Sequence, residues 1–301
     1  MTLKDLHSTF KLLDGNKIPC LGFGTYKIDK GQAGIDTLLH AIELGYRHFD
    51  TASLYGTEEA LGTAIKLSGI DRKKIFVTTK VWKDDLEPEK IRASLASSLE
   101  KLQLDYVDLL LIHWPRATEE DDGWEDRLAK AWQTFIELKE EGKTKSIGVA
   151  NFLPHHFDAL KSEVKPCVDQ IEFHPGYMQT GAVDYCHRHD IVVEAWMPLG
   201  RGALIDLPVV KEIAIKHQVS AGQVLLRFCL DHEVLPLVKS SNIERIRQNA
   251  DIFDFKLSED ELTALRAVAE KTAWSGEHPD LSIPKLRLLQ NRDFLNRQSQ
   301  T

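Results

Sequence analysis

Short apolar runs alternate with amphipathic segments along most of the chain, from about residue 21 to about residue 251. Each apolar run has the length of one buried strand, and the segments between the runs are long enough for helices. We predict eight strands, at residues near 21 and at 47–49, 75–79, 107–112, 146–149, 168–171, 191–195 and 235–238.

Helical periodicity is clearest at residues 88–101 and 129–141. In the second segment Ala131 and Phe135 lie one turn apart, and Gly142 supplies a stop. Eight strand–helix units in one chain predict an α/β fold, and units of this size favour a (β/α)8 TIM barrel over an open sheet.

Both ends of the chain add to this barrel. Residues 11–19 carry Asp14-Gly15 at their centre, which is typical of a β-hairpin turn. From Lys271 on the periodicity is lost, but the aromatic and proline residues there indicate a C-terminal tail that packs on the barrel. Because no proline- or serine-rich linker divides the chain, we expect residues 1–301 to form one domain.

Composition narrows the classes of function. With 43% hydrophobic residues the chain can bury a sizeable core, and a net charge of −8 argues against a nucleic-acid or anionic-membrane partner. The apolar runs are too short to span a bilayer, and the first residues lack the apolar core of a signal peptide. Four scattered cysteines without metal-ligand spacing indicate a reduced, cytoplasmic protein, which we expect to be a monomer.

Polar residues follow three consecutive strands at the end where barrel enzymes carry their chemistry. Asp50, Lys80 and His113 end the second, third and fourth predicted strands, and Tyr55 lies in the loop after the second. A carboxylate, an ammonium, an imidazole and a phenol together suit proton transfer, with the phenol as the acid. Taken singly, each has a plainer interpretation, such as a surface lysine, a buried histidine or a helix-capping aspartate.

With their flanking strings, these four residues resemble the catalytic tetrad of the aldo-keto reductase family. Further strings follow in the family's order over nearly the whole chain, at residues 22–25, 148–152, 169–175, 198–200 and 238–240. Trp196, where many members have Tyr, makes the chain similar to the microbial branch that includes 2,5-diketo-gluconate reductases. The resemblance implies an oxidoreductase that reduces aldehydes and ketones to alcohols by hydride transfer from NADPH.

The resemblance also implies a role for each tetrad member. Tyr55 is the general acid, and because a free tyrosine has a pKa of about 10, we expect Lys80 to lower it. Asp50 holds the Lys80 ammonium in place, and His113 orients the substrate carbonyl oxygen toward Tyr55.

Cofactor binding does not follow the Rossmann pattern. Residues 22–27 hold two of the three glycines of that fingerprint, and Lys27 stands in the third place. The resemblance instead places NADPH across the top of the barrel, with Trp196 stacked under the nicotinamide; plain core packing is the alternative for this Trp. The contacts implied at this end of the cofactor are Gly24, Thr25, Asp50, Asn151, Gln170, Trp196 and Leu199.

Residues 238–249 have the features of an anion site at a helix N-terminus. A pocket for the 2′-phosphate would favour NADPH over NADH, and the alternative is a capped surface helix with a salt-bridging arginine. The residues concerned are Lys239, Ser240, Asn242 and Arg245 for the phosphate, with Gln248 and Asn249 for the adenine.

Three positions depart from the family's pattern: Ala150 stands for a Ser, Thr57 for an Asn and Trp196 for a Tyr. The substitutions at Ala150 and Trp196 are expected to affect cofactor affinity and not activity. The resemblance lines the pocket mouth with aromatic side chains, which suit a small-molecule carbonyl substrate. The implied substrate contacts are Tyr26, Trp82, His113 and Trp114.

Two other functions are alternatives to a reductase. One is a regulatory barrel subunit that binds NADPH and senses redox state, against which the complete tetrad counts. The other is a short-chain dehydrogenase, suggested by Tyr26-x-x-x-Lys30, but that class requires a glycine-rich loop that the sequence lacks. No metal is expected, because the pair His155-His156 has no third ligand at a useful spacing.

Overall fold

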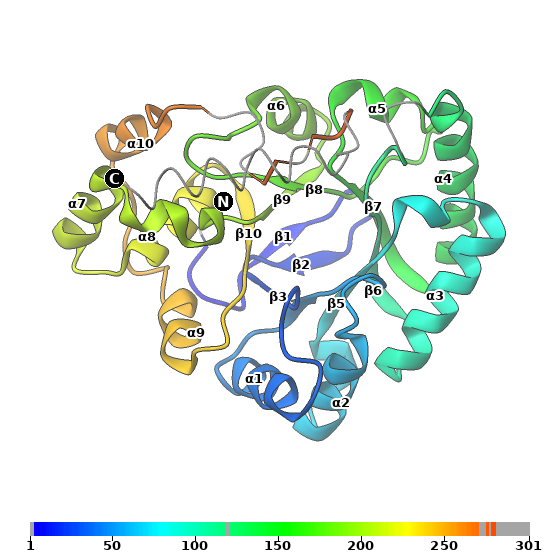
Figure 1. Ribbon diagram of the computed structural model, residues 1–301, viewed down its shortest axis with the longest axis horizontal. Coiled ribbons are helices and arrows are strands. Elements are labelled where there is room, and N and C mark those ends of the chain that lie inside the picture. Colours follow the sequence, from blue (N-terminus) through cyan, green and yellow to red (C-terminus); the bar gives the residue numbers. More distant parts are fainter. Residues whose placement is uncertain (1–2, 118–120, 271–274, 277, 281–301) are drawn as a thin grey trace.

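The computed structural model describes residues 3–117, 121–270, 275–276 and 278–280. Eight parallel strands close into a barrel in the order β10-β3-β4-β5-β6-β7-β8-β9 (Figure 1). The strands are β3 Gly22–Gly24, β4 His48–Asp50, β5 Phe76–Val81, β6 Val107–Ile112, β7 Thr144–Ala150, β8 Val168–Glu172, β9 Val192–Trp196 and β10 Val234–Val238. The predicted (β/α)8 class is confirmed, and every predicted strand overlaps or adjoins an observed one.

Helices surround the barrel in Figure 1. They are α1 Gln32–Glu43, α2 Glu58–Ser68, α3 Pro88–Leu102, α4 Trp124–Glu140, α5 Pro154–Asp158, α6 Thr180–Arg188, α7 Pro208–His217, α8 Ala221–Asp231, α9 Ile243–Ala250 and α10 Glu259–Arg266, with 3-10 turns η1 Arg72–Lys74, η2 Lys83–Asp85 and η3 Gly200–Asp206. Helix α4 begins before the predicted residue 129. Its first turn contains Glu125 and Asp126, whose charges favour a helix N-terminus but hide the apolar periodicity.

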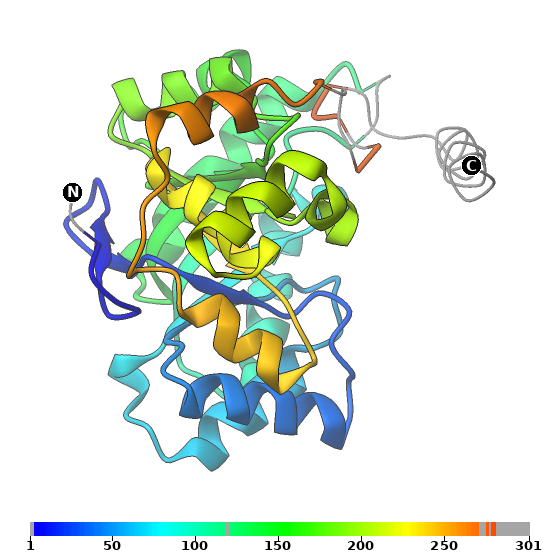
Figure 2. The same cartoon turned by 90° about the vertical axis from the view of Figure 1, so that its left-hand side faces the viewer.

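The predicted hairpin is present as β1 Thr9–Lys11 and β2 Lys17–Pro19, joined by a turn with Gly15 at φ +90°. The Asn16 amide donates to the Lys145 carbonyl at 3.2 Å and to the Ser146 hydroxyl at 3.0 Å, which fastens the turn to the start of β7. In Figure 2 the hairpin lies at one end of the barrel, and residues 275–276 and 278–280, drawn in red, lie at the other.

Apolar side chains fill the space between strands and helices, and all six residues of β6 are buried. In the part of the chain that is described, no helix is both long and apolar enough to cross a membrane. Residues 275–276 and 278–280 do pack on the barrel, through Ser275 to Glu172 and Asp280 to His155. The aromatic residues Trp274 and Phe294 of the expected tail lie outside the described residues.

Candidate active site

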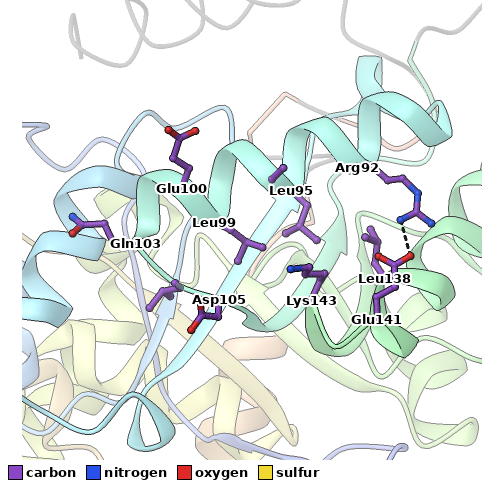
Figure 3. A pocket seen from close by; sticks show the side chains of 11 residues that line it. Arg92, Leu95, Leu99, Glu100, Gln103, Asp105, Leu138, Glu141 and Lys143 are labelled. Atoms are coloured by element: carbon purple, nitrogen blue, oxygen red, sulfur yellow. Dashed lines mark hydrogen bonds and ion pairs between the residues drawn. The ribbon is translucent and has the colours of Figure 1, made fainter.

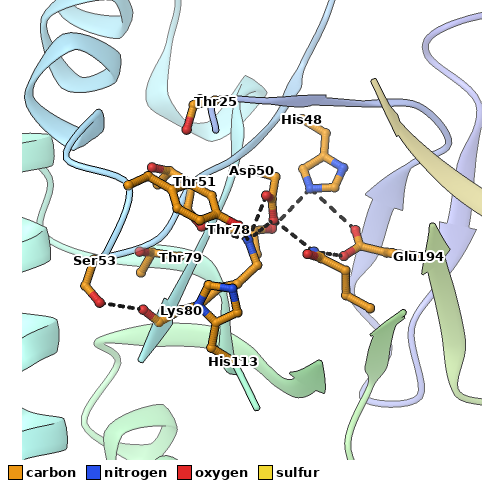
Figure 4. Close-up of polar contacts among 12 residues, drawn as sticks. Thr25, His48, Asp50, Thr51, Ser53, Thr78, Thr79, Lys80, His113 and Glu194 are labelled. Atoms are coloured by element: carbon orange, nitrogen blue, oxygen red, sulfur yellow. Dashed lines mark hydrogen bonds and ion pairs between the residues drawn. The ribbon is translucent and has the colours of Figure 1, made fainter. Parts of the chain in front are cut away.

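The four tetrad residues meet at the C-terminal ends of the strands, and Figure 4 labels three of them, Asp50, Lys80 and His113. Lys80 Nζ lies 2.7 Å from both carboxylate oxygens of Asp50, 2.9 Å from the Thr51 carbonyl oxygen and 3.5 Å from the Tyr55 hydroxyl. Lys80 is 1% exposed, so its charge depends on the Asp50 carboxylate rather than on water. The His113 ring stands edge-on to Tyr55 at 5.7 Å between centroids.

Burial dominates the electrostatics of this group. It is the largest single influence on Lys80 and lowers its pKa, but Asp50 and Tyr55 together outweigh it and the pKa of Lys80 is raised. Burial raises the pKa of Tyr55 to about 12, with Lys80 opposing the shift only in part. Lys80 thus lowers the pKa of the phenol, as expected, but burial outweighs this effect and the net pKa lies above the ordinary value, because the hydroxyl is removed from water and the lysine is already paired with Asp50. Burial, then Lys80, holds the pKa of His113 well below its usual range.

Of the predicted substrate contacts, the aromatic side chains of Tyr26 and Trp82 touch tetrad residues. Tyr26 is 47% exposed and its ring lies 5.0 Å from that of Tyr55. The Trp82 ring stands edge-on to His113 at 5.1 Å, and its indole donates to Asp84 at 3.1 Å. Trp114 is half-buried directly after His113.

Asn151 joins two residues of the site. Its amide nitrogen donates to the His113 carbonyl at 2.9 Å, and its amide oxygen accepts from the Trp196 indole at 2.8 Å. Asn151 has φ +63°, in the left-handed region that Asn tolerates better than most residues. Trp196 is half-buried at the end of β9, so its indole is held in place but not enclosed by the core.

The Gln170 amide nitrogen donates to Asp50 at 2.9 Å and to Glu194 at 2.8 Å, below the tetrad. The Thr25 hydroxyl is hydrogen-bonded to that of Thr57 at 2.8 Å, which gives the unusual threonine at position 57 a structural role. Beside Thr25, a methyl group added at Gly24 would lie in ordinary contact with Lys239 and the Val238 carbonyl oxygen, both at 3.9 Å. Leu199 precedes η3 and is partly buried.

The predicted phosphate end lies at the start of α9. Asn242 caps this helix by accepting from the Arg245 backbone N–H at 3.0 Å, and the Ser240 hydroxyl accepts from the Asn242 N–H at 3.1 Å. Lys239 and Arg245 are exposed, and neither forms an ion pair with any residue that the structure describes. Two free cations at a capped helix start fit an anionic group. Of the adenine candidates, Gln248 bonds to Glu244 at 3.2 Å and Asn249 is buried.

In the structure, Asp280 lies beside His155 and His156 as a third potential metal ligand, which the sequence did not indicate. Asp280 Oδ1 lies 2.8 Å from His155 Nε2 and 3.0 Å from His156 Nε2. However, His156 Nδ1 accepts the Leu153 backbone N–H at 2.9 Å, so its proton is on Nε2, which cannot then bind a metal. The cluster therefore fastens the C-terminal residues to α5, and the expectation of no metal site stays a prediction.

A surface groove of about 530 Å³ lies between α3 and α4 (Figure 3). Its floor is apolar, with Leu95, Leu99 and Leu138, and an Arg92–Glu141 ion pair of 2.8 Å crosses its rim. No tetrad residue lines it, so the groove is not the candidate active site.

The sequence profile of the Aldo/keto reductase family matches residues 20–270, which includes the whole tetrad and both predicted cofactor ends. The chain belongs to the aldo-keto reductase family. This aldo-keto reductase is 42% identical to a Bacillus subtilis protein named glyoxal reductase, over 91% of this chain and 97% of that protein. It is 40% identical to an Escherichia coli O157:H7 protein named methylglyoxal reductase DkgA, over 85% and 91% of the two chains.

Among solved structures, this aldo-keto reductase is similar to one from Bombyx mori in complex with NADP, with a TM-score of 0.82 and 32% identity over 94% of this chain and 100% of that one. The chain is thus an NADPH-dependent oxidoreductase that reduces aldehydes and ketones. Membership of this family excludes the short-chain dehydrogenase, and the reductase names of the relatives give no support to a regulatory subunit.

Proposed function

We propose that this reductase acts on small aldehydes and α-oxoaldehydes of the glyoxal and methylglyoxal type, with Tyr55 as the general acid. One observation carries the proposal: the Tyr55 hydroxyl lies 3.5 Å from Lys80 Nζ, which is itself locked 2.7 Å from Asp50. A phenol with a pKa raised to about 12 is fully protonated at neutral pH and has a proton to give.

NADPH supplies the hydride for the carbonyl carbon when it is bound. The chain's own residues do the rest: His113, a neutral imidazole, holds the carbonyl oxygen close to Tyr55, and Tyr55 delivers the proton to that oxygen. The Lys80 ammonium then stabilises the phenolate that Tyr55 leaves behind, and Asp50 keeps the ammonium in position.

The substrate class rests on the names of two relatives and on the mouth of the site. Tyr26, Trp82 and Trp114 offer apolar walls with few polar groups, which suit a small dicarbonyl better than a sugar phosphate or a charged polymer. We also propose that residues 1–301 form a single domain and that the protein is a cytoplasmic monomer; the four free, buried cysteines support the reducing compartment.

For the cofactor we propose the residues around two ends of the site. The nicotinamide end would be held by Gly24, Thr25, Asp50, Asn151, Gln170, Trp196 and Leu199, and the adenosine end by Lys239, Ser240, Asn242, Arg245, Gln248 and Asn249. The exposed cations of Lys239 and Arg245, which form no ion pair with any described residue, support the assignment of the adenosine end.

Tyr55→Phe tests the proposal. The variant keeps the ring and its packing against Tyr26 and His113 but has no proton to deliver. We expect methylglyoxal reduction to fall by about two to four orders of magnitude in kcat, while NADPH affinity stays within about twofold. If kcat falls less than about tenfold, Tyr55 is not the acid.

A further inference from the structure

A second layer of polar side chains lies in the barrel interior below the tetrad. Glu194, in the middle of β9, is fully buried and points inward together with His48 of β4. Figure 4 shows Glu194 and His48 lying together on one side of Asp50. The reaction described above uses neither residue, and a carboxyl group without access to water is costly unless it has partners.

The partner of Glu194 is the Gln170 amide. One amide nitrogen donates to Glu194 Oε2 at 2.8 Å and to Asp50 Oδ2 at 2.9 Å, and an amide nitrogen has two hydrogens. Asp50 and Glu194 together therefore take both hydrogens and set the rotation of the amide. Within the described chain no hydrogen bond to the Gln170 side-chain oxygen Oε1 is found, so this atom remains available as an acceptor.

We propose that Glu194 is a positioning residue for carbonyl reduction, which acts through Gln170. With Asp50 it fixes the Gln170 amide so that the side-chain oxygen Oε1 is free for the cofactor's carboxamide. The same arrangement keeps the Asp50 carboxylate directed at Lys80. This inference rests on the proposed function, because it gives Glu194 control over the group that holds Lys80 next to Tyr55.

The charge of Glu194 matters because few groups surround it. Facing it are His48 and Asp50 from β4 and Lys80 from β5, whereas β10 and β3 have no titratable side chain. On the neighbouring β8, Asp169 is turned away, toward the Phe152 N–H and Cys186.

Burial, and then repulsion by Asp50, raises the pKa of Glu194 to about 8, although Gln170 and Lys80 oppose the shift. Glu194 is thus neutral at pH 7 and becomes an anion as the pH rises through about 8. The new negative charge holds the Lys80 ammonium more tightly and makes the Tyr55 phenol a weaker acid, so the reduction rate falls.

The test compares wild type, Glu194→Gln and Glu194→Met, with Glu58→Gln as the matched control. Glu58 is also a buried glutamate, and it bonds to Thr79 at 2.8 Å and not to Gln170 or Asp50. Two quantities are measured from pH 6 to pH 10: NADPH affinity by fluorescence titration, and kcat for methylglyoxal reduction.

We expect an alkaline fall in kcat near pH 8 in wild type and in Glu58→Gln, and no such fall in Glu194→Gln, whose side chain cannot ionise. Glu194→Gln still offers an acceptor to Gln170, so its NADPH affinity at pH 7 should match wild type within about twofold. Glu194→Met offers none, and its NADPH affinity should weaken about two- to tenfold, the range of one neutral hydrogen bond.

An alkaline fall that persists in Glu194→Gln overturns the proposal, as does its loss in Glu58→Gln. Should Glu194→Met fail to fold, the pH profile and the NADPH affinity of Glu194→Gln still decide the matter. Tyr55→Phe distinguishes failure of this proposal from failure of the proposed function. If Tyr55→Phe is inactive while Glu194→Gln keeps the alkaline fall, only the role of Glu194 is rejected. If Tyr55→Phe is active, the proposed function itself is rejected.

Discussion

At the scale of single residues, the proposed proton donor, Tyr55, lies beside a buried charge pair. Lys80 has three donor hydrogens, and Asp50 and the Thr51 carbonyl lie at hydrogen-bond distance, with the Tyr55 hydroxyl at 3.5 Å. The geometry leaves the lysine little freedom, so the phenol meets its positive charge at a fixed distance. Such preorganisation removes the need to rearrange solvent dipoles during the reaction.

The pKa of His113 sets the acid side of the pH profile. Because burial and Lys80 hold it well below its usual range, the imidazole stays neutral on acidification past its ordinary pKa of about 6.5. We expect kcat/KM for methylglyoxal reduction to be flat from about pH 5.5 to about pH 7.5. A tenfold loss per unit of pH beginning near pH 6.5 would contradict a neutral, buried His113.

Trp196 and Asn151 give a stability prediction. Trp196→Phe keeps an aromatic ring but leaves the buried Asn151 amide oxygen without its 2.8 Å donor. We expect urea unfolding to show a loss of about 1–3 kcal/mol in the free energy of unfolding. Trp82→Phe is the control, because it breaks a bond to the exposed Asp84 and should change the same quantity by about 0.5 kcal/mol or less. Equal losses would mean that the Trp196 bond has no special weight.

The sequence predicts Asp50, Lys80 and His113 as site candidates because each polar residue ends an apolar run, where a barrel carries its chemistry. Glu194 has no such signal. It lies inside the apolar run of β9, and a lone carboxylate there looks like a solvent-facing position. Only the closed barrel, which turns alternate residues of each strand inward, shows that Glu194 and Asp50 share one amide.

At the scale of elements, the start of helix α9 lies next to two exposed cations, Lys239 before the helix and Arg245 in its first turn, and neither is paired with a described residue. Arg245→Ala should raise the NADPH dissociation constant about ten- to hundredfold and leave that of NADH nearly unchanged, since a charge-assisted bond to phosphate contributes about 1.5–3 kcal/mol. Affinity is measured for both cofactors by fluorescence titration.

Arg247→Ala is the matched control for this prediction. Arg247 is an exposed arginine in the last turn of the same helix, so its removal changes the net charge equally. A similar loss in both variants would assign the effect to the general field of the protein and not to a phosphate site.

Element boundaries were predictable wherever hydrophobic periodicity decides them. Strand β6 begins and ends where the apolar run does, and α3 lies within one residue of the predicted range. The start of α4 was missed because charges that favour a helix start interrupt the apolar pattern. The contact between Asp280 and His155 could not be predicted, since 125 residues separate the partners and no local pattern links them.

At the scale of the whole molecule, the number of strand–helix units was enough to predict closure of the barrel. Parallel strands need crossover connections, and eight such units bury both faces of the sheet only when the sheet closes. The hairpin was predictable from its Asp-Gly turn, but its attachment through Asn16 to β7 required the structure. Fold and tetrad thus follow from local pattern, whereas the links between distant strands do not.

The cysteines give a prediction for the intact protein. Cys20, Cys167, Cys186 and Cys229 are all buried, and burial raises the pKa of each, to about 12 for Cys20 and to about 11 for Cys167. Since the thiolate is the reactive form, we expect no thiol to react with a colorimetric disulfide reagent in the native state and four to react in concentrated urea. Rapid reaction of one native thiol would show that the barrel opens at that cysteine.

The burial of the four thiols has a chemical consequence for an enzyme that reduces reactive carbonyl compounds. α-Oxoaldehydes, the proposed substrates, are electrophiles that add to thiols, so an enzyme that reduces them is exposed to modification by its own substrate. Here every thiol is enclosed by packed side chains and protonated, while the Lys80 amine at the reaction centre is kept as an ammonium, which is not nucleophilic, by Asp50. The packing that builds the barrel therefore also protects the thiols from covalent modification by the proposed substrates.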